Sequence, residues 1–485
     1  MIIKIIKKNE VYLHIECEYQ IKKELYDYFT FDVPNAKFMP QYKSGVWDGK
    51  IHLFSPGNSE LYGGLYRHLL EFCDNNEYTY EIINNNFYGS PEDVNDISIA
   101  DIIEMVKNFG ITFEPRDYQL KTIHECLKYK KRLILSATSS GKSFSIYCIV
   151  RHLTEQGCKT LIIVPTTTLT TQLYKDFESY GWESEKYCHK IYAGKSKTTN
   201  LPVIISTYQS LSRMPKKYFD DIGAVIVDEA HTATSTSIKG IMEKLHNAEY
   251  RLGFTGTLRD AKSHRLFLEG NFGLVENVIS AKELMNRGYA ANLKIKVLLL
   301  KHNKKSFSSY HDEIDYLVSN TKRNNLIKNL VKDLKGNTLV LFSLVEKHGK
   351  ILYDLMKNDK DTYFVHGGVD TEIREQVRNI VEETEKDSVI ISSYQVFQQG
   401  INIKNLHNVV FASPSKSKIR NLQSIGRVLR VKEGKTHATL YDIADEIPNG
   451  NYKNFTLNHM MERIKTYASE NFDYEIINVN INDEQ

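Results

Sequence analysis

Residues 132–145, RLILSATSSGKSFS, run from a short apolar segment into a loop that ends in glycine, lysine and serine. The segment at 132–136 predicts a buried strand, and the amphipathic stretch at 144–153 (FSIYCIVRHL) predicts a helix. A loop in this setting directs its backbone N–H groups and the helix N-terminus at a phosphate group. Gly141, Lys142 and Ser143 match the pattern G-x-x-x-x-G-K-[ST], whereas Ser136 replaces its first glycine. The stretch therefore predicts a phosphate loop, although one imperfect motif is not specific by itself.

The chemistry expected of this loop is that of an ATP site. The backbone of Ser139, Ser140 and Gly141 would cradle the β-phosphate. Lys142 would bridge the β- and γ-phosphates, and the Ser143 hydroxyl would hold Mg²⁺. The loop thus predicts ATP and Mg²⁺ as cofactors.

Apolar runs on the C-terminal side of the loop continue the same strand–helix pattern through most of the chain. They alternate with amphipathic segments, which is typical of parallel βαβ units. The first set of predicted strands is 132–136, 160–164, 202–206, 223–227 and 250–254. The second set is 293–300, 338–342, 362–365, 388–392, 408–412 and 438–442. Two sets of this size predict an α/β protein with two parallel-sheet lobes, joined near 288–293.

The two ends of the chain have sequence patterns that differ from the strand–helix alternation of the lobes. Residues 1–83 consist of short, aromatic-rich alternating runs and predict a small α+β domain, and the polar stretch at 84–96 predicts a linker. Residues 455–470 (FTLNHMMERIKTYASE) predict a helix. We therefore expect an N-terminal domain with its linker at 1–96, a first lobe at 97–290, a second lobe at 291–450 and a C-terminal helical extension at 451–485.

Composition excludes several classes of protein. The 485 residues, 41% apolar and 25% charged, are typical of a soluble globular chain, and no run of eighteen apolar residues predicts a membrane span. The six cysteines are scattered without a C-x-x-C pair, which predicts neither a disulfide framework nor a zinc ribbon and favours a cytoplasmic location. The net charge of +3 is nearly balanced, so a polyanion site must come from local clustering.

A second motif, Asp228-Glu229-Ala230-His231, follows the predicted strand at 223–227. An acidic pair at the C-terminal end of a strand is placed to hold Mg²⁺ and to activate water. Asp228 would bind the metal, and Glu229 would orient and deprotonate the attacking water. A solvated acidic loop is the alternative, but it does not explain why the pair follows both a buried strand and a phosphate loop.

The third motif, QSIGRVLR at 423–430, predicts a helix with Gln423, Arg427 and Arg430 on one face. Such a face is commonly a solvated surface. The apolar residues between them would bury the opposite side and aim the arginines out of the second lobe. An arginine that reaches a transferring phosphoryl group accelerates the reaction by about 10³–10⁵ where it operates.

Taken in order, these motifs resemble the series found in superfamily 2 helicases and translocases. The full series is FEPRDYQ (113–119), SATSSGKS (136–143), IVPTTTLTTQ (163–172), ISTYQSL (205–211), DEAH (228–231), TGT (255–257), VLFS (340–343), VHGG (365–368), ISSYQVFQQGINI (391–403) and QSIGRVLR. The resemblance covers about residues 113–445. It implies two RecA-like lobes that bind ATP and act on nucleic acid.

The resemblance also implies a role for individual residues. Around the nucleotide, the implied contacts are Arg116, Tyr118 and Gln119 at the adenine, Gly400 from the second lobe, and Arg427 and Arg430 at the γ-phosphate, with Arg427 as the arginine finger. The residues implied to couple nucleotide state to the nucleic acid are His231, Thr255, Thr257 and Gln423. Hydroxyls and backbone amides that would grip a strand's phosphates without reading sequence are at Thr166, Thr167, Thr207, Ser343, His366, Gly367, Ser392 and Ser393.

Two positions depart from the family pattern. Asn402 stands where aspartate is frequent in the Gly-Ile-Asp segment, which makes a ribose contact there uncharged and strict ATP preference less secure. Ser136 replaces the first loop glycine, but many members of the superfamily also lack that glycine.

The segment FMPQYKSGVWDGKIHLF at 38–54 interleaves aromatic residues with lysines. One interpretation is a hairpin with a packed Trp47. The other is a surface on which Trp47 and its neighbours stack bases or follow a nucleic-acid backbone. The physical chemistry of the segment favours neither.

Nearly the whole chain resembles the UvsW-type recombination helicases of large tailed bacteriophages. The segments that carry this resemblance are GVWDGK (45–50), IVPTTTLTTQ, TGTLRD (255–260), QSIGRVLRVK (423–432) and KTYASENFDY (465–474). It implies a DNA partner and the unwinding of branched DNA: migration of Holliday junctions, regression of stalled forks and dissolution of R-loops, which makes RNA–DNA hybrids a further substrate. The implied setting is phage recombination, replication and repair in the bacterial cytoplasm, and we expect a monomer.

Three other functions remain open at the level of sequence. One is the motor of a restriction system, although residues 1–83 offer no cluster of two acids and a lysine at nuclease spacing. Another is a nucleotide-gated annealing protein with vestigial hydrolysis, which the intact set of charged site residues disfavours. The third is an RNA helicase, because contacts to backbone phosphates tolerate either sugar.

Overall fold

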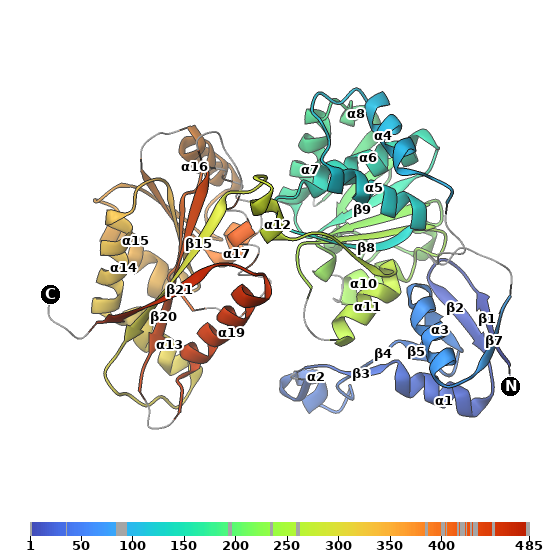
Figure 1. Cartoon of the computed structure of the whole chain (residues 1–485), viewed down its shortest axis with the longest axis horizontal. Coiled ribbons are helices and arrows are strands. Elements are labelled where there is room, and N and C mark those ends of the chain that lie inside the picture. The colour runs from blue at the N-terminus through green and yellow to red at the C-terminus, as the bar shows by residue number, and fades with distance from the viewer. Residues whose placement is uncertain are drawn as a thin grey trace. The chain divides into compact units, whose positions relative to one another are not determined.

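The computed structural model of the chain divides into two compact units, formed by residues 1–136 with 141–278 and by residues 137–140 with 279–485 (Figure 1). The structure describes residues 2–34, 36–83, 95–192, 196–232, 236–258, 262–383, 387–398, 403, 405–414, 417, 422, 424–426, 429, 435–448 and 452–481. No helix among these residues combines the length and apolar character needed to span a membrane.

The N-terminal part of the first unit is a small α+β domain. Its five-stranded sheet has the order β5-β6-β2-β1-β7, and β3 and β4 form a separate ribbon. The strands are β1 (Ile2–Lys7), β2 (Tyr12–Glu16), β3 (Thr30–Asp32), β4 (Lys50–His52), β5 (Phe54–Ser55), β6 (Glu60–Tyr62) and β7 (Thr79–Ile83). The helices are α1 (Tyr19–Tyr28), α2 (Pro40–Lys43) and α3 (Tyr66–Asn75). Alternation places Ile3 and Ile5 of β1 in the core while Lys4 faces solvent.

The rest of the first unit is built on a seven-stranded sheet of order β10-β11-β9-β12-β13-β8-β14. Its central strands are continuous apolar runs because helices cover both faces. The strands are β8 (Lys131–Ser136), β9 (Thr160–Val164), β10 (Cys188–Ile191), β11 (Val203–Thr207), β12 (Ala224–Asp228), β13 (Tyr250–Thr255) and β14 (Val275–Ile279). The helices are α4 (Ile99–Asn108), α5 (Asp117–Tyr129), α6 (Lys142–Glu155), α7 (Thr167–Ser179), α8 (Ser184–Tyr187), α9 (Tyr208–Leu211), α10 (Thr236–Met242) and α11 (Lys262–Phe272).

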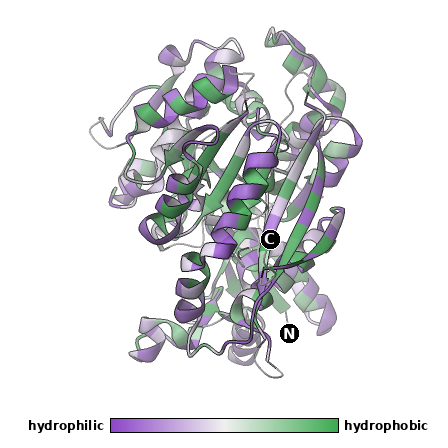
Figure 2. Cartoon of the chain, turned by 90° about the vertical axis from the view of Figure 1, so that its left-hand side faces the viewer, coloured by the Kyte–Doolittle hydropathy of each residue, from purple (hydrophilic) through white to green (hydrophobic). Residues whose placement is uncertain are grey.

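The second unit contains another seven-stranded sheet, of order β17-β18-β16-β19-β20-β15-β21. Its strands are β15 (Asn292–Lys301), β16 (Thr338–Phe342), β17 (Asp361–Val365), β18 (Ser388–Ser393), β19 (Asn408–Phe411), β20 (His437–Glu446) and β21 (Tyr474–Asn480). Its helices are α12 (Ala281–Asn286), α13 (Tyr310–Ser319), α14 (Thr321–Asp333), α15 (Lys350–Met356), α16 (Thr371–Glu383), α17 (Tyr394–Gln398) and α19 (Phe455–Ser469), with a π-helical turn, η5 (Val345–Gly349), before α15. Figure 2 shows that the strands are mostly hydrophobic and that the helices carry both hydrophobic and hydrophilic residues.

The predicted fold class is confirmed: two parallel seven-stranded sheets follow a small α+β domain. Every strand range predicted for the two lobes overlaps an observed strand. The helix predicted at 455–470 is α19, but the chain then returns to the second sheet as β21, parallel to β15. Three further strands, β21, β10 and β14, are not predicted from the sequence, and all three are edge strands.

The N-terminal domain is packed tightly against the rest of its unit. Gly64 lies against the end of α11, where a Cβ atom would come within 2.0 Å of the Glu269 carbonyl oxygen. Beside it, the His68 ring is 2.7 Å from Glu269, and the Tyr62 hydroxyl donates to Glu243 at 2.6 Å. These contacts hold the domain as one body with the sheet that carries the phosphate loop.

A buried ion pair links this domain to β8 itself. The Lys131 ammonium, at the start of β8, donates to the Glu10 carboxylate at 2.9 Å. Burial lowers the pKa of Lys131 to about 8, against the opposing effect of Glu10. Burial also opposes ionisation of Glu10, but Lys131 and Lys7 outweigh it and hold its pKa below the usual value. The first residue of β8, the strand that leads into the phosphate loop, is therefore paired with the N-terminal domain.

Candidate nucleotide and nucleic-acid site

The phosphate loop connects β8 to α6 in the first half of the chain. Gly141 is the residue before α6 and has φ 85°, a left-handed conformation that glycine adopts without steric cost. Ser139 is also left-handed, with φ 72°. Ser140, between these two residues, does not have a positive φ, and such an alternation turns backbone N–H groups to one side and forms an anion-binding concavity. The Lys142 ammonium donates to the Ser136 carbonyl oxygen at 3.1 Å, so it folds back over the loop.

Gln119 lies directly beside this loop. Its side chain is buried, and its amide nitrogen is 2.4 Å from the position a Cβ atom would take at Gly141. The Gln119 amide oxygen accepts the Arg116 backbone N–H at 3.0 Å. The Arg116 guanidinium in turn donates to the Tyr118 hydroxyl at 2.7 Å. The three residues predicted to hold the adenine are thus linked to one another, and Gln119 is adjacent to the loop.

The acidic pair follows β12, which lies in the same sheet as β8. Asp228 is the last residue of the strand and accepts the Glu229 backbone N–H at 2.9 Å. Burial, followed by the Glu229 carboxylate, raises the pKa of Asp228 to about 6, and Lys142 acts against this rise. Glu229 has φ 53°, a strained conformation for a residue with a side chain. A buried carboxylate of this kind is stabilised as the anion by a nearby cation.

These side chains fit a magnesium ion held together with nucleotide phosphates. No cluster of three or more His, Cys, Asp and Glu residues suited to a metal occurs in the described part of the chain. Mg²⁺ usually binds through one or two protein groups, with substrate phosphates and water as its other ligands. Asp228 and the Ser143 hydroxyl are the groups that would hold it.

His231 connects the acidic motif to the end of β13. Its Nδ1 is 3.0 Å from Thr255 Oγ1 and 3.2 Å from the Glu229 carboxylate. Thr255 Oγ1 donates its own proton to the Thr257 carbonyl oxygen at 2.8 Å. It therefore accepts from His231, which places a proton on Nδ1. The structure brings together the three coupling residues predicted in this unit.

The other predicted contacts of the first unit lie at strand and helix ends. Thr166 caps α7 by accepting the Leu169 N–H at 3.3 Å, and Thr167 begins that helix. The Thr207 hydroxyl, at the end of β11, is 3.1 Å from Ser210 Oγ. In the N-terminal domain the Trp47 indole N–H donates to the Lys50 carbonyl oxygen at 2.8 Å, which fixes the ring against the turn.

The predicted contacts of the second unit follow β16, β17 and β18. Ser343 is exposed after β16. After β17, His366 Nδ1 accepts the Gly368 N–H at 3.2 Å, and the Gly367 carbonyl oxygen accepts from Arg374 at 3.0 Å. The Ser392 hydroxyl is fully buried and donates to the Ser393 carbonyl oxygen at 3.3 Å. Four predicted site residues, Gly400, Gln423, Arg427 and Arg430, lie outside the described residues.

Ser413 and His348 support Ser343 and were missed by the sequence analysis. The Ser343 backbone N–H donates to Ser413 Oγ at 3.1 Å, and His348 Nδ1 is 2.9 Å from the same oxygen. Burial lowers the pKa of His348 to about 3, so the ring is neutral and its Nδ1 shares one hydrogen bond with the Ser413 hydroxyl. Ser413 closely follows β19 as Ser343 follows β16, which is the signal that would have indicated it.

A phosphate loop, a strand-end Asp–Glu pair and a His–Thr contact on one of two parallel seven-stranded sheets define the class of superfamily 2 helicases. Comparison with known proteins agrees. The N-terminal domain of the DNA helicase UvsW matches residues 3–83, the res subunit of type III restriction enzymes matches 112–260, and the helicase conserved C-terminal domain matches 321–432. The chain belongs to the UvsW helicase family: it is 36% identical to the ATP-dependent DNA helicase UvsW of phage T4, over 97% of this chain and 98% of that protein.

Other relatives are more distant. The DNA 3′-5′ translocase XPB2 of Sulfurisphaera tokodaii is 27% identical, over 66% of this chain and 79% of that protein. The crystal structure of T4 UvsW has a TM-score of 0.52 at 34% identity, over 99% of this chain and all of that one. Dbp5 of S. cerevisiae has a TM-score of 0.57 at 15% identity, over 79% of this chain and 94% of that one, and shows the fold alone.

Proposed function

We propose that this protein is an ATP-dependent DNA helicase that unwinds and branch-migrates branched DNA, namely Holliday junctions, stalled forks and R-loops, in phage recombination, replication and repair. The observation that carries the proposal is the candidate site of the first unit, where the charge of Lys142 acts on the buried Asp228 carboxylate. There, Gln119 and Gly141 lie side by side, and Glu229, His231 and Thr255 are joined by short contacts. The similarity to T4 UvsW extends over nearly the whole chain, including the N-terminal domain.

Each part of this site has a role in hydrolysis. The loop amides and Lys142 would bind the phosphates, and Asp228 with Ser143 would hold Mg²⁺, which supplies charge neutralisation when bound. The Glu229 carboxylate would orient the attacking water and take its proton. The Asp228 carboxylate, already kept near Lys142, stays ionised once a cation is beside it. Arg427 and Arg430 are proposed to stabilise charge on the γ-phosphate.

The contact between His231 and Thr255 would carry the result of hydrolysis to the DNA. A change at the γ-phosphate alters the position of Glu229, which lies 3.2 Å from His231. His231 is bonded to Thr255, and Thr255 to the backbone of Thr257. We propose that this chain of contacts shifts the loop after β13 against the bound strand. Gln423 would act in the same coupling from the second lobe.

The N-terminal domain is proposed to bind nucleic acid through the surface around Trp47. Because Glu10 pairs with Lys131 at the start of β8, the domain follows the movement of the strand that carries the phosphate loop. The domain division at 1–96, 97–290, 291–450 and 451–485 is part of this proposal. We also propose that the protein acts as a monomer, on DNA and on RNA–DNA hybrids, in the cytoplasm of a bacterial host.

A restriction-type DNA translocase is the second candidate, because a restriction-enzyme family model matches residues 112–260. A magnesium-dependent cutting assay on plasmid DNA separates the two. The helicase proposal expects no cleavage.

The test of the main proposal compares unwinding of a four-way junction, a fork, an R-loop and a plain duplex with arms of equal length. We expect ATP-dependent unwinding that is faster on the branched substrates than on the duplex. Equal rates on all four would overturn the branch-specific part. Absence of ATP-dependent unwinding on every substrate would overturn the helicase assignment.

A further inference from the structure

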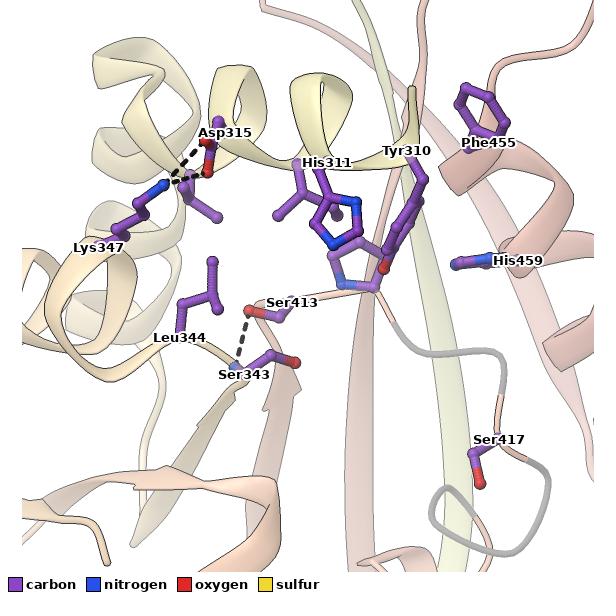
Figure 3. Close-up of a pocket in the computed structure, with 13 residues that line it drawn as sticks. Tyr310, His311, Asp315, Ser343, Leu344, Lys347, Ser413, Ser417, Phe455 and His459 are labelled. Atoms are coloured by element: carbon purple, nitrogen blue, oxygen red, sulfur yellow. Dashed lines mark hydrogen bonds and ion pairs between the residues drawn. The ribbon is translucent and has the colours of Figure 1, made fainter. Parts of the chain in front are cut away.

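The second unit contains a cavity whose walls lie mostly outside the helicase motifs. It has a volume of about 800 Å³, and its lining includes Ser343 and Ser413, which follow β16 and β19. Figure 3 shows Tyr310 and His311 of α13 on one side and Phe455 and His459 of α19 on the other. The volume is within the range of about 300–1,000 Å³ that is usual for small-molecule and cofactor sites.

Aromatic rings from two helices form one end of this cavity. The Tyr310 ring centroid is 5.1 Å from that of His459 and 6.3 Å from that of Phe455. Phe455, the first residue of α19, is 42% exposed, so part of its ring is accessible to a ligand. Exposed aromatic rings beside a phosphate-binding path are the surfaces on which unpaired bases stack.

The opposite end of the cavity carries both hydrogen-bond donors and acceptors. The Lys347 ammonium donates to both carboxylate oxygens of Asp315 at 2.8 Å, as drawn in Figure 3. Because this pair is neutral overall, it does not attract a phosphate by charge. An acidic side chain accepts from an exocyclic amino group of a base, and lysine donates to a base carbonyl oxygen. The chemistry of this end suits the edge of a nucleobase.

The two aromatic walls are fixed to each other by a buried carboxylate. Glu313 of α13 is fully buried and accepts from four donors at the start of α19. Its oxygens accept from Asn454 Nδ2 at 2.8 Å, Phe455 N at 2.8 Å, Thr456 N at 2.7 Å and Thr456 Oγ1 at 2.6 Å. The spacing between Tyr310 and Phe455 is thus set before any ligand binds, which lowers the ordering cost of binding.

We propose that this cavity binds one unstacked nucleobase of a single strand whose backbone passes Ser343. The base stacks on Phe455 and Tyr310, and its edge reaches Asp315 and Lys347. This inference rests on the proposed helicase function, since strand separation is the step that supplies unstacked bases. The cavity would hold the strand on the second unit without selecting a sequence through its stacking contacts.

The first test is photo-crosslinking of the full-length protein to a single-stranded oligonucleotide that carries 5-iodouracil. We expect mass spectrometry to place the crosslink on Tyr310, Phe455 or His459. A crosslinked protein in which none of these residues is modified would overturn the proposal.

The second test measures affinity for the same strand without the photoreactive base. We expect Phe455→Ala to weaken single-strand binding by about 5- to 150-fold, the range seen when one stacking residue is removed. Phe455→Trp should restore most of the affinity, because it restores a ring. Tyr452→Ala is the matched control: Tyr452 is 80% exposed, lies three positions before Phe455 and does not line the cavity. Unchanged affinity of Phe455→Ala would overturn the proposal and leave the cavity for a protein segment.

Failure of this inference is distinguishable from failure of the proposed function. If the wild type unwinds DNA and Phe455→Ala binds single strands normally, only the proposed base-binding cavity is refuted. If the wild type neither binds single strands nor hydrolyses ATP faster with DNA, both the base-binding cavity and the proposed helicase function are refuted.

Discussion

The imidazole of His231 and the hydroxyl of Thr255 are joined by a hydrogen bond of 3.0 Å, and the same hydroxyl donates to the Thr257 carbonyl oxygen. Both side chains are buried, so water does not replace the bond when it breaks. This arrangement links the residue next to the proposed general base with the loop after β13. A buried side-chain bond of this kind contributes about 1 kcal/mol.

We expect loss of either partner to separate hydrolysis from unwinding. His231→Ala and Thr255→Ala should each keep measurable ATP turnover but unwind fewer base pairs per ATP consumed. Because the two residues act through one bond, the double variant should be little worse than either single variant, with a coupling energy of about 1 kcal/mol. Coupled ATPase and unwinding assays measure this. Additive effects of the two changes would show that the bond does not carry the coupling.

Gly141 provides a sharper test of the phosphate loop. Gly141→Ala introduces a side chain at φ 85° and brings its Cβ 2.4 Å from the buried Gln119 amide. We expect ATP affinity to fall by about tenfold or more, because both the loop and Gln119 must shift. A fluorescent nucleotide titration measures the change.

The control for that change is Gly157→Ala. Gly157 is also left-handed, with φ 75°, but nothing lies within 4 Å of its Cβ position. The control should lower the free energy of unfolding by about 1 kcal/mol and leave ATP affinity unchanged. Equal nucleotide affinities in the two variants would show that the contact with Gln119 is irrelevant.

The close approach at Gly64 predicts that the N-terminal domain depends on that residue for its attachment. Gly64→Ala places a Cβ within 2.0 Å of the Glu269 carbonyl oxygen, and backbone cannot move aside as a side chain can. We expect a cost of about 3 kcal/mol and faster hydrogen exchange in both α3 and α11. Gly57→Ala, with nothing within 4 Å, is the matched control and should exchange like the wild type. Unchanged exchange in Gly64→Ala would contradict the tight attachment.

A buried network in the second unit predicts that the free energy of unfolding of the protein depends on pH. Arg323 donates to both oxygens of Asp445 at 2.9 and 3.0 Å, and His302 lies 2.9 Å from the same carboxylate. Burial opposes ionisation of Asp445, but Arg323 and His302 outweigh it and lower its pKa from 3.8 to about 2. The folded pKa is below the unfolded value, so the stabilisation is complete above about pH 4 and is lost as pH falls toward 2.

Asp445→Asn should therefore destabilise the protein by about 3–5 kcal/mol at pH 7, since it leaves the buried Arg323 without a counter-charge. Denaturant unfolding at several pH values should show that the difference in free energy of unfolding between the wild type and Asp445→Asn becomes smaller below pH 4. Asp473→Asn removes an exposed acid paired with Lys282 and should change stability by less than about 1 kcal/mol. A gap for Asp445→Asn that is constant down to pH 2 would contradict the ionised pair.

The sequence predicted the central strands of both large sheets because these strands are buried on both faces. β9, β12 and β16 are continuous apolar runs, which length and flanking turns identify as strands. The strands that were missed, β10, β14 and β21, stand at sheet edges, where one side is unpaired and fewer positions need to be apolar. β21 is mostly exposed along its length, so only pairing with β15 identifies it.

Residues of the candidate site could be proposed from the sequence where chemistry requires a residue type at a fixed place in a motif. Lys142, Asp228 and His231 belong to this group, as they follow or precede strands that the sequence indicates. Ser413 and His348 could not be found in the same way, because their role depends on two strand ends and η5 meeting in space. Glu313 was missed for the same reason, since its four donors are more than 140 positions away.

The decisive measurement of the proposed nucleotide site is ATP turnover of the wild type and of Lys142→Ala, with and without four-way-junction DNA. Binding of the junction is measured in the same samples. We predict that the junction stimulates wild-type turnover. We also predict that Lys142→Ala loses turnover while it still binds the junction, because the ammonium is proposed to contact the phosphates of the nucleotide and not the DNA. Wild-type turnover in Lys142→Ala would contradict the account, because the site would then lie elsewhere in the chain.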